Sequence, residues 1–440
     1  MSVPDQKEVK KMTMDVPMES TDNETCREAT APEEIADVVI VGAGMVGTAL
    51  ACLLGEAGVK VVLVDARDAL LDPETVGLGH PGMRVSALTP VSRKLLEGLG
   101  AWEWMAARRV SPYRFMQVWD AEGTGEVSFS AEQAGVARLG HIVENEVTQA
   151  ALERGLKARA SVRVVLGARV TGLVESADGD RCVHLADGRR LMAPLVVGAD
   201  GARSPLRELA GIDVDAHETG HMAVVTTVKV ERPHGDVARQ AFLRTGPLAF
   251  LPLRLGGERH HCSIVWSTSP EEAERLQELT TEALGEELAA AIGHRLGGVT
   301  VVDRAVAFPL VQRHAQRYVL PGLALVGDAA HSIHPLAGQG VNLGLMDAAV
   351  LAEELLWARS RGVALSNERW LSRYARRRRG DNAGMLALMS GFRLLFGARH
   401  PALTLARNMG LGAVDRLTPL KRLMLQQAMG HRGRLPVSCR

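Results

Sequence analysis

The chain lacks the features that mark several large classes of protein. No apolar run reaches the ~18 residues that a membrane-spanning helix needs, and the N-terminus has no charged-then-apolar signal pattern. The five cysteines are scattered without a Cys-x-x-Cys pair, which argues against zinc, an iron–sulfur cluster or a dithiol switch. Aromatic residues make up only 4%, and no stacking motif of the kind that nucleic-acid binding uses interleaves with the basic residues. We expect a cytoplasmic globular protein with reduced thiols and no metal site.

What the chain does contain is enough apolar sequence for a large core. Its 440 residues are 46% hydrophobic, which leaves room for two or three domains. The 51 basic and 51 acidic residues balance over the whole chain. They are unevenly placed, because 17 Lys and Arg follow Ala358 against only three acidic residues.

A glycine-rich turn follows the first apolar run. The run Val38–Val41 leads into Gly42, Gly44 and Gly47, and a helical stretch follows. A second apolar run ends in Asp65, 18 residues after Gly47. Strand, Gly-x-Gly-x-x-Gly turn, helix, strand and acid in this order are typical of a site for the ADP half of a dinucleotide. The unit by itself does not separate NAD from FAD.

A second motif lies near the C-terminal third of the chain. An apolar run ends in Gly327-Asp328, and a turn containing Gly338 and Gly340 then runs into a predicted helix. An acid at a strand end can hold a ribitol or ribose hydroxyl. The glycines let backbone N–H groups approach a ligand, and the helix directs its positive end toward it. The segment therefore predicts a binding site for a sugar alcohol, with a group of backbone N–H donors beside it that stabilises negative charge.

A third motif, Asp200-Gly201, ends the apolar run Leu195–Gly198. Taken alone, Asp200 is better explained as a cap of the following helix than as a ligand contact.

Together, the three motifs resemble those of the group A flavoprotein monooxygenases, the single-component aromatic hydroxylases. The resemblance covers the chain from about Asp37 onward. The run from His331 to Ala348 is similar to that of the ubiquinone-biosynthesis hydroxylases, most of all the polyprenylphenol branch. Arg84 and Gln149 match positions that lie near the flavin in this family. One departure is Asp65, where the family more often has glutamate.

The resemblance implies FAD as the cofactor and NAD(P)H as a co-substrate that binds transiently, because only one nucleotide-binding unit is visible. NAD(P)H would reduce FAD, and O2 would give a flavin C4a-hydroperoxide that hydroxylates a polyprenylated phenol or benzoquinol. Flavin-edge positions are expected at Gly338, Gly340, His334 and Pro335. The expected cofactor-binding residues are Gly42, Gly44, Gly47, Asp65, Arg84, Gln149, Asp200, Gly201, Gly327, Asp328, Gly338, Gly340, Val341 and Asn342.

The predicted fold is α/β, or α+β overall. A Rossmann-like FAD-binding domain is expected from residues 37–110, 141–212 and 318–374. A β-sheet substrate domain is expected from 111–140 and 213–317, because strand-like alternation concentrates there. Residues 1–36 are predicted to be a disordered tail, and 375–440 a helical C-terminal region.

The basic C-terminal region leaves two interpretations open. It contains the run Arg376–Arg379 and a predicted apolar stripe of Leu417, Leu420, Leu423, Met424 and Met429. One interpretation is a bundle helix with a solvated basic face. The other is contact with the anionic inner face of a membrane, where a polyprenyl substrate resides. Other ubiquinone-biosynthesis proteins and a second copy of the chain are further expected partners, and nucleic acid is not.

Three other functions share some or all of these motifs. An NAD-dependent dehydrogenase accounts for Gly42 to Asp65 but not for Asp200-Gly201 or Gly327-Asp328. A soluble FAD monooxygenase for another small aromatic shares every motif. A non-catalytic flavin-binding component of a biosynthetic complex also shares them, and only turnover separates it from an enzyme.

Overall fold

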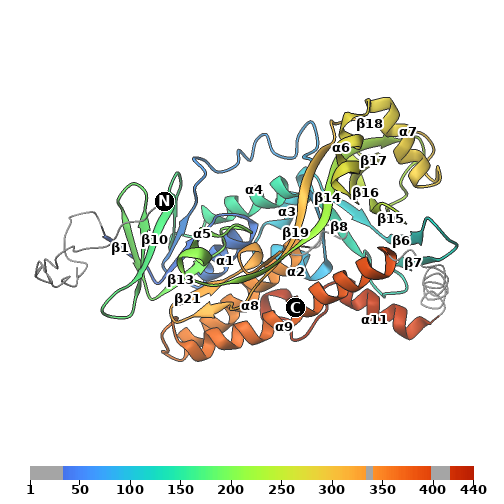
Figure 1. Ribbon diagram of the computed structural model, residues 1–440. Coiled ribbons are helices and arrows are strands. Elements are labelled where there is room, and N and C mark those ends of the chain that lie inside the picture. The colour runs from blue at the N-terminus through green and yellow to red at the C-terminus, as the bar shows by residue number, and fades with distance from the viewer. Residues whose placement is uncertain (1–32, 333–339, 398–416) are drawn as a thin grey trace, which may run out of the picture.

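The computed structural model of the chain describes residues 33–332, 340–397 and 417–440 (Figure 1). Within it, a six-stranded sheet carries the N-terminal glycine motif. Its strands are β2 (Val38–Val41), β3 (Val61–Val64), β9 (Val162–Val165), β13 (Leu195–Gly198), β20 (Val319–Leu320) and β21 (Leu323–Leu325). They lie in the order β20-β21-β13-β2-β3-β9, parallel except for the β20–β21 pair. The carboxyl ends of β2, β13 and β21 therefore share one edge, and each is followed by one of the three motifs.

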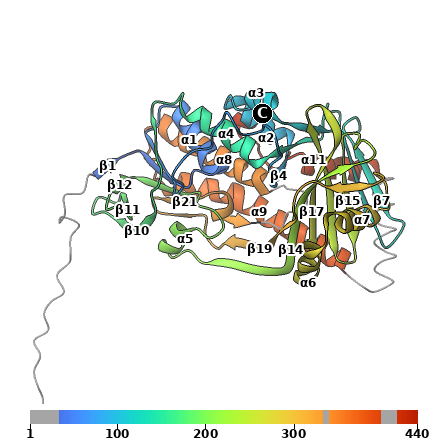
Figure 2. The same cartoon turned by 90° about the horizontal axis from the view of Figure 1, so that it is seen from above.

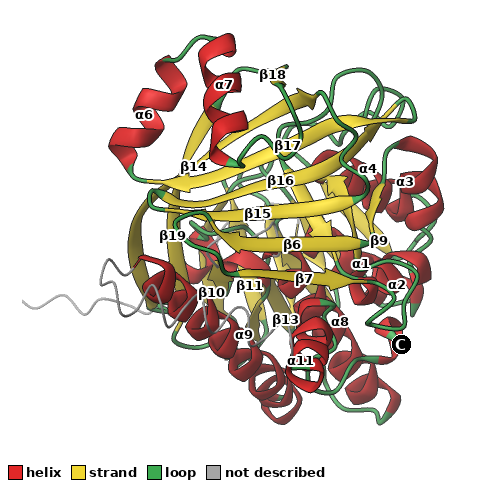
Figure 3. Ribbon diagram, turned by 90° about the vertical axis from the view of Figure 1, so that its right-hand side faces the viewer, coloured by secondary structure: helices red, strands yellow, loops and turns green. Residues whose placement is uncertain are grey.

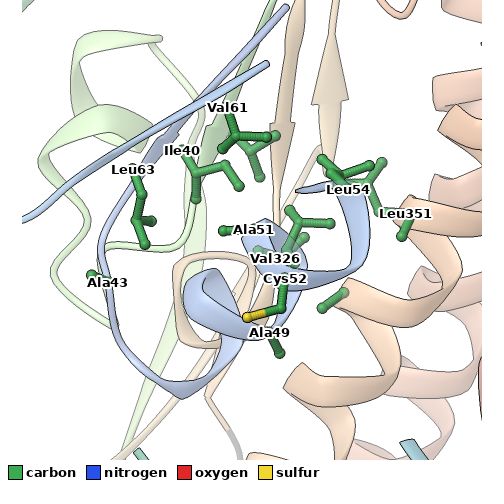
Figure 4. Packing of buried hydrophobic residues seen from close by; sticks show 14 of the residues in the cluster. Ile40, Ala43, Ala49, Ala51, Cys52, Leu54, Val61, Leu63, Val326 and Leu351 are labelled. Carbon is green, nitrogen blue, oxygen red and sulfur yellow. The ribbon is translucent and has the colours of Figure 1, made fainter. Parts of the chain in front are cut away.

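The core of this part forms because the strands are buried on both faces. β2, β3 and β13 are fully buried apolar runs, as expected of a parallel sheet covered by helices. Helix α1 (Met45–Glu56) packs on the sheet, and helix α8 (Gly340–Ser360) packs on α1. Figure 4 shows Ala51 and Leu54 of α1 among Ile40 and Val61 of the strands and Leu351 of α8.

A nine-stranded sheet forms the second large layer (Figure 3). Its strands are β6 (Phe115–Asp120), β7 (Glu126–Ser130), β14 (Val214–Val230), β15 (Val237–Leu243), β16 (Gly246–Leu255), β17 (Glu258–Thr268), β18 (Val299–Val301), β19 (Val306–Ala315) and β22 (His331–Ser332). The order is β22-β19-β14-β17-β16-β15-β6-β7, with β18 beside β14. Strand β22 belongs to the segment expected in the FAD-binding domain, so this segment adds one strand to the sheet of the predicted substrate domain.

The two faces of this large sheet differ. One face carries bulky side chains, among them Trp119, Phe250 and Trp266, and packs against α6 (Pro270–Glu278) and α7 (Thr281–Ala291). The opposite face carries smaller apolar residues. These are Ala223, Val225, Ala249, Leu251, Val265 and Leu310.

Two smaller sheets complete the layers seen in Figure 2. One has the order β1-β12-β11-β10 and the other β4-β8-β5. Their strands are β1 (Glu33–Ile35), β10 (Val170–Glu175), β11 (Arg181–Leu185), β12 (Arg190–Ala193), β4 (Val85–Leu88), β8 (Gly140–Glu144) and β5 (Ser111–Tyr113). The remaining helices are α2 (Pro90–Gly98), α3 (Trp102–Arg108), α4 (Asn145–Leu156), α5 (Pro205–Leu209), α9 (Glu368–Gly397) and α11 (Thr418–Ala428), with short 3-10 turns η1 (Gly327–Ala329) and η2 (Val437–Cys439).

The predicted fold class is confirmed, whereas two expected boundaries need correction. The tail predicted for residues 1–36 ends earlier, because Glu33–Ile35 pairs with β12 as a parallel strand. The boundary expected between Tyr374 and Ala375 falls inside α9, which runs unbroken from Glu368 to Gly397. Helical hydrogen bonding continues through this point, and Tyr374 is fully buried, donating to the Leu325 carbonyl at 2.6 Å.

The C-terminal region is not a separate appendage. Leu425 and Met429 of α11 are buried against Val127 and Phe129 of β7. Cys439 is buried in the core of the FAD-binding part. The predicted apolar stripe is therefore wrong as one surface, because Leu417 and Leu423 are 53% exposed whereas Met429 packs inward. Leu425, which the pattern omitted, takes the inward position.

The basic run Arg376–Arg379 also needs correction. Only Arg376 and Arg379 are exposed. Arg377 pairs with Glu353 and Glu354 at 2.7 and 2.8 Å, and Arg378 is 3% exposed. Successive helical residues point about 100° apart, so four consecutive arginines cannot face one surface. In the described residues, no helix is both long and apolar enough to cross a membrane.

Candidate cofactor site

The three glycines of the first motif occupy three different environments. A Cβ on Gly42 would lie 2.3 Å from the Ala199 carbonyl oxygen, and the φ of Gly42 is +104°. A Cβ on Gly47 would lie 1.9 Å from the Gly42 carbonyl oxygen. A Cβ on Gly44 would meet no protein atom within 4 Å. Gly42 and Gly47 thus let the chain turn and pack closely, whereas Gly44 faces open space where a ligand can approach the backbone.

The start of α1 also fits an anionic group. Gly44 is its N-cap residue and makes no side-chain capping hydrogen bond, and the first turn contains no acidic residue. The first N–H groups of a helix have no partner within the helix, and the helix dipole places positive charge there. Together these features form a cradle for a pyrophosphate.

Tight packing brings the three motifs together at this cradle. The carbonyl of Ala199, which precedes Asp200, lies against Gly42. Gly327 has a φ of +60°, and a Cβ there would lie 3.1 Å from a methyl of Val46 in the first turn of α1. Residues far apart in the sequence therefore meet at the shared carboxyl edge of β2, β13 and β21.

Asp65 lies beside the glycine turn and has several donors. One oxygen accepts the Ala43 N–H at 2.6 Å, and the other accepts the backbone N–H and the Nε of Arg67 at 2.8 and 3.0 Å. Gln149 is nearby and donates to the Ala43 carbonyl at 2.8 Å. The structure thus places both predicted residues at the turn, with Asp65 held in a fixed orientation.

Arg67 and Glu153 are parts of this cluster that sequence reasoning missed. Arg67 donates to the Ala43 carbonyl at 2.8 Å and to Glu153 at 3.1 Å. Glu153 also accepts from Gln149 at 2.7 Å. A signal was available in the sequence, because Glu153 lies one helical turn after Gln149 and faces the same side.

Asp328 lies in η1 with its side chain exposed. Desolvation by the surrounding protein nevertheless raises the pKa of the Asp328 carboxyl, against the lowering effects of His331 and Arg84. Arg84 is exposed and close enough to act on the charge of Asp328, so these two predicted residues share one region.

Asp200 has a structural contact of its own. Its carboxylate accepts the Leu206 N–H of α5 at 3.0 Å, and desolvation raises its pKa. The capping interpretation therefore describes part of what Asp200 does. Gly201, with a φ of +87°, leaves open space where a Cβ would stand.

The start of α8 is described from Gly340 onward, and Gly338, His334 and Pro335 lie outside the described residues. Val341 packs against the core, and the side chain of Asn342 is buried. Asn342 accepts the Thr89 N–H at 2.9 Å and donates to the Ala87 carbonyl at 2.8 Å. Its side chain thus anchors the helix start, which leaves the backbone N–H groups as the predicted flavin contact.

The residues present fit FAD. The open space at Gly44 and the uncapped α1 N-terminus suit the pyrophosphate, and the exposed Asp328 suits a polyhydroxyl chain. Within residues 33–332, 340–397 and 417–440, no cluster of His, Cys, Asp or Glu has the arrangement of a metal site. The described cysteines are all buried, namely Cys52, Cys182, Cys262 and Cys439.

Comparison with known proteins agrees with this geometry. A family model described as an FAD binding domain matches residues 35–386. The 3-demethoxyubiquinol 3-hydroxylase of Escherichia coli K12 is 41% identical over 399 residues, which cover 91% of this chain and 99% of that protein. The ubiquinone hydroxylase UbiL of Rhodospirillum rubrum is 39% identical, with 90% of each chain covered. The mitochondrial ubiquinone biosynthesis monooxygenase COQ6 of Xenopus tropicalis is 34% identical, covering 88% of this chain and 92% of that protein.

Solved structures show the same architecture. The complex of Pseudomonas aeruginosa PqsL with 2-aminobenzoylacetate superposes with a TM-score of 0.70 at 26% identity, covering 86% of this chain and all of that chain. The p-nitrophenol 4-monooxygenase PnpA of Pseudomonas putida DLL-E4 gives a TM-score of 0.72 at 20% identity, covering 92% of this chain, and shows the fold alone. The chain belongs to the FAD-binding-domain family and, within it, to the ubiquinone-biosynthesis hydroxylases, which are FAD-dependent monooxygenases.

Proposed function

We propose that this chain hydroxylates the ring of a polyprenylated phenol or benzoquinol in ubiquinone biosynthesis, using FAD, NAD(P)H and O2. The observation that carries the proposal is the meeting of the three motifs at one sheet edge, in a chain that matches a demethoxyubiquinol hydroxylase over 99% of that protein's length. A dehydrogenase needs only the first motif. The same motifs support the assignment of the predicted site residues to FAD.

In this proposal each part of the site has one task. The N-terminus of α1 and Gly44 hold the pyrophosphate, and Asp65, fixed by Arg67, accepts a ribose hydroxyl. Asp328 accepts from the ribityl chain. Backbone N–H groups at the start of α8 face the flavin edge that gains negative charge. When bound, FAD supplies the redox and oxygen chemistry, and the protein binds, orients and excludes water.

The small-residue face of the large sheet is the proposed surface for the substrate ring. Ala223 and Val225 of β14 lie on this face. Val265 of β17 packs against their cluster and against the cluster that includes Ala87 and Ile142 of the β4–β8 sheet. Phe308 of β19 pairs directly with Ala223, so both side chains lie on the same face. Phe308 is 38% exposed, whereas its cross-strand partner Ala223 is buried. An accessible aromatic ring on an apolar face suits contact with an aromatic or prenyl group.

Turnover with a prenylated phenol tests the function. Purified holoprotein is mixed with NADH or NADPH, O2 and a short-chain prenylated phenol, and oxidation of the nicotinamide is followed. We expect substrate-stimulated oxidation and a product heavier by one oxygen atom. Oxidation that no phenol stimulates would favour a non-catalytic flavin component, and equal turnover of unprenylated small phenols would favour a soluble aromatic hydroxylase.

Association with an anionic membrane surface is the second part of the proposal. Arg369, Arg376 and Arg379 are exposed on α9, and none of the ion pairs found in the described residues includes them. Leu417, the N-cap residue of α11, and Leu423 within α11 are each 53% exposed. Exposed basic residues and exposed apolar side chains both suit an anionic leaflet, which attracts each basic residue by about 1 kcal/mol.

Liposome flotation tests this part with a charge-matched control. Arg376→Gln with Arg379→Gln should weaken binding to anionic liposomes, most clearly at low salt, because the screening length is about 8 Å at physiological ionic strength. The control pair is Arg163→Gln with Arg244→Gln, whose side chains are 59% and 78% exposed on other elements. Equal weakening by both pairs would show only the effect of net charge. Unchanged flotation of the first pair would refute the membrane role of α9.

A further inference from the structure

The buried carboxylate of Asp347 in α8 holds both ends of the turn that carries Asp328. Its Oδ2 accepts the Gly327 N–H at 3.0 Å and contacts the Nε2 of His331 at 2.5 Å. Gly327 precedes Asp328, and His331 follows it by three residues. The conformation of the intervening backbone decides where the Asp328 side chain points, and that backbone is fixed at both ends by one group.

The other oxygen of Asp347 faces α9. Its Oδ1 accepts from the Nε of Arg378 at 2.6 Å and from Asn382 at 3.2 Å. Asp347 has no exposed surface, and Arg378 is 3% exposed. Tyr318 completes the network, because its ring stacks on His331 with centroids 6.0 Å apart and its hydroxyl accepts from Asn382 at 3.2 Å. A buried carboxylate with donors on both oxygens is held in one orientation, since any rotation leaves a buried charged group unpaired.

We propose that Asp347, with Arg378 behind it, is a positioning residue that orients Asp328 toward FAD. Neither residue lies in a glycine motif, and neither side chain is exposed, so both act through the Gly327–His331 turn. The inference rests on the proposed placement of Asp328 in the FAD site. It predicts that FAD affinity depends on the Asp347 carboxylate beyond any effect on folding.

The same pair of helices offers a matched control. Glu354 lies two helical turns after Asp347 in α8 and has no exposed surface. It pairs with Arg373 at 2.9 Å and with Arg377 at 2.8 Å, both in α9. Glu354→Gln therefore disrupts a buried ion pair between the same two helices without touching the Gly327–His331 turn.

The experiment prepares the apoproteins of Asp347→Asn, Glu354→Gln and the parent chain and measures the Kd of each for added FAD. Thermal unfolding of each apoprotein is measured alongside. An asparagine presents an amide in place of one acceptor oxygen, so two buried donors lose their partner in either orientation. We expect Asp347→Asn to raise the Kd for FAD on the order of tenfold or more. Glu354→Gln should leave the Kd close to that of the parent even where its melting temperature falls as much. Equal weakening by both variants would overturn the inference.

A second pair of variants covers the case in which Asp347→Asn does not fold. His331→Gln keeps an N–H donor close to the position of Nε2, whereas His331→Leu removes it. The inference predicts near-parent FAD affinity for His331→Gln and weakened binding for His331→Leu, and equal affinities would overturn it. Asp328→Asn separates the two proposals. If Asp328→Asn leaves the Kd for FAD unchanged, the placement of Asp328 in the FAD site is wrong. If Asp328→Asn weakens FAD binding but Asp347→Asn and Glu354→Gln have the same Kd for FAD, only the positioning role of Asp347 is wrong.

Discussion

The side-chain oxygen of Asn342 accepts the backbone N–H of Thr89 at 2.9 Å, although the two residues are 253 positions apart. The same oxygen accepts the Ser92 hydroxyl at 2.7 Å. Thr89 is the N-cap of α2, and Asn342 stands in the first turn of α8. One amide therefore joins the starts of two helices, and the backbone proposed to face the flavin is held from behind.

Replacement of Asn342 by alanine should destabilise the apoprotein. The change leaves the Thr89 N–H, the Ser92 hydroxyl and the Ala87 carbonyl without this partner in a buried region. Each unsatisfied buried group costs about 1–3 kcal/mol. We therefore expect a marked decrease in the free energy of unfolding, measured by urea denaturation. Asn367→Ala serves as the control, because Asn367 is exposed and its side chain accepts one hydrogen bond within the described residues, from the Arg369 N–H at 3.1 Å. A similar loss for both variants would contradict the anchoring role of Asn342.

Gly44 and Gly47 should respond oppositely to a larger side chain. Gly44→Val projects into open space, so the apoprotein should fold with nearly unchanged stability and lose most of its FAD. Gly47→Ala forces a Cβ against the Gly42 carbonyl, and such overpacking costs about 1–3 kcal/mol or more. Flavin content after purification and the melting temperature of the apoprotein measure the two effects. A Gly44→Val protein that retains stoichiometric flavin would refute the pyrophosphate assignment.

Asp328→Asn should lower the affinity for FAD and raise the stability of the apoprotein. Desolvation raises the pKa of Asp328 in the folded chain, so the ionised carboxylate disfavours folding at pH values above that pKa. The neutral amide removes this penalty, and the apoprotein of the variant should melt at a higher temperature near neutral pH. The difference should shrink as the pH falls through the raised pKa, because the parent then gains its proton. Melting curves of the two apoproteins from pH 7 downward measure this, and a variant that melts lower at neutral pH would contradict it.

The ionised carboxylate of Asp347 should stabilise the folded chain, in contrast to that of Asp328, and this stabilisation should be lost in acid. Burial alone would raise the pKa of Asp347, but the charges and hydrogen bonds of His331 and Arg378 outweigh it and lower the pKa from 3.8 to about 2. The stabilisation is present above the ordinary value and is lost as the pH falls toward 2, on the order of 2 kcal/mol. The melting temperature of the parent apoprotein should therefore fall more steeply in this window than that of Asp347→Asn. Parallel curves would refute the contribution.

Phe308→Ala should impair substrate binding and spare the cofactor. Loss of an aromatic contact costs about 1–3 kcal/mol, so we expect the KM for a prenylated phenol to rise roughly tenfold. Phe115 provides the control, since it is 43% exposed and lies on the same side of β6 as Trp119, on the opposite face of the sheet. Flavin content should stay at the parent level in both variants. Equal KM values for Phe308→Ala and the parent would exclude this face near Phe308 as the ring site.

The sequence by itself determined that the cofactor contains a dinucleotide, and it determined the order of the motifs. A backbone that must approach a phosphate needs glycine at Gly44, and the acids Asp65 and Asp328 follow apolar strands at recognisable positions. These are local requirements, so they are visible without knowledge of distant contacts. Apolar alternation likewise indicated the large sheet between His221 and Trp266.

Tertiary structure decided which residues of the same type, in the same stretch of sequence, have different roles. In the sequence, Arg376 and Arg378 are equivalent members of one basic run, but helix geometry turns the first to solvent and the second toward the buried Asp347. The contacts of Asp347 with Arg378, and of Arg67 with Ala43 and Glu153, carry no local signal, because these partners lie more than 20 residues away in the sequence. A side chain's burial and charge environment depend on packing between segments far apart in the chain, and local periodicity does not contain that information.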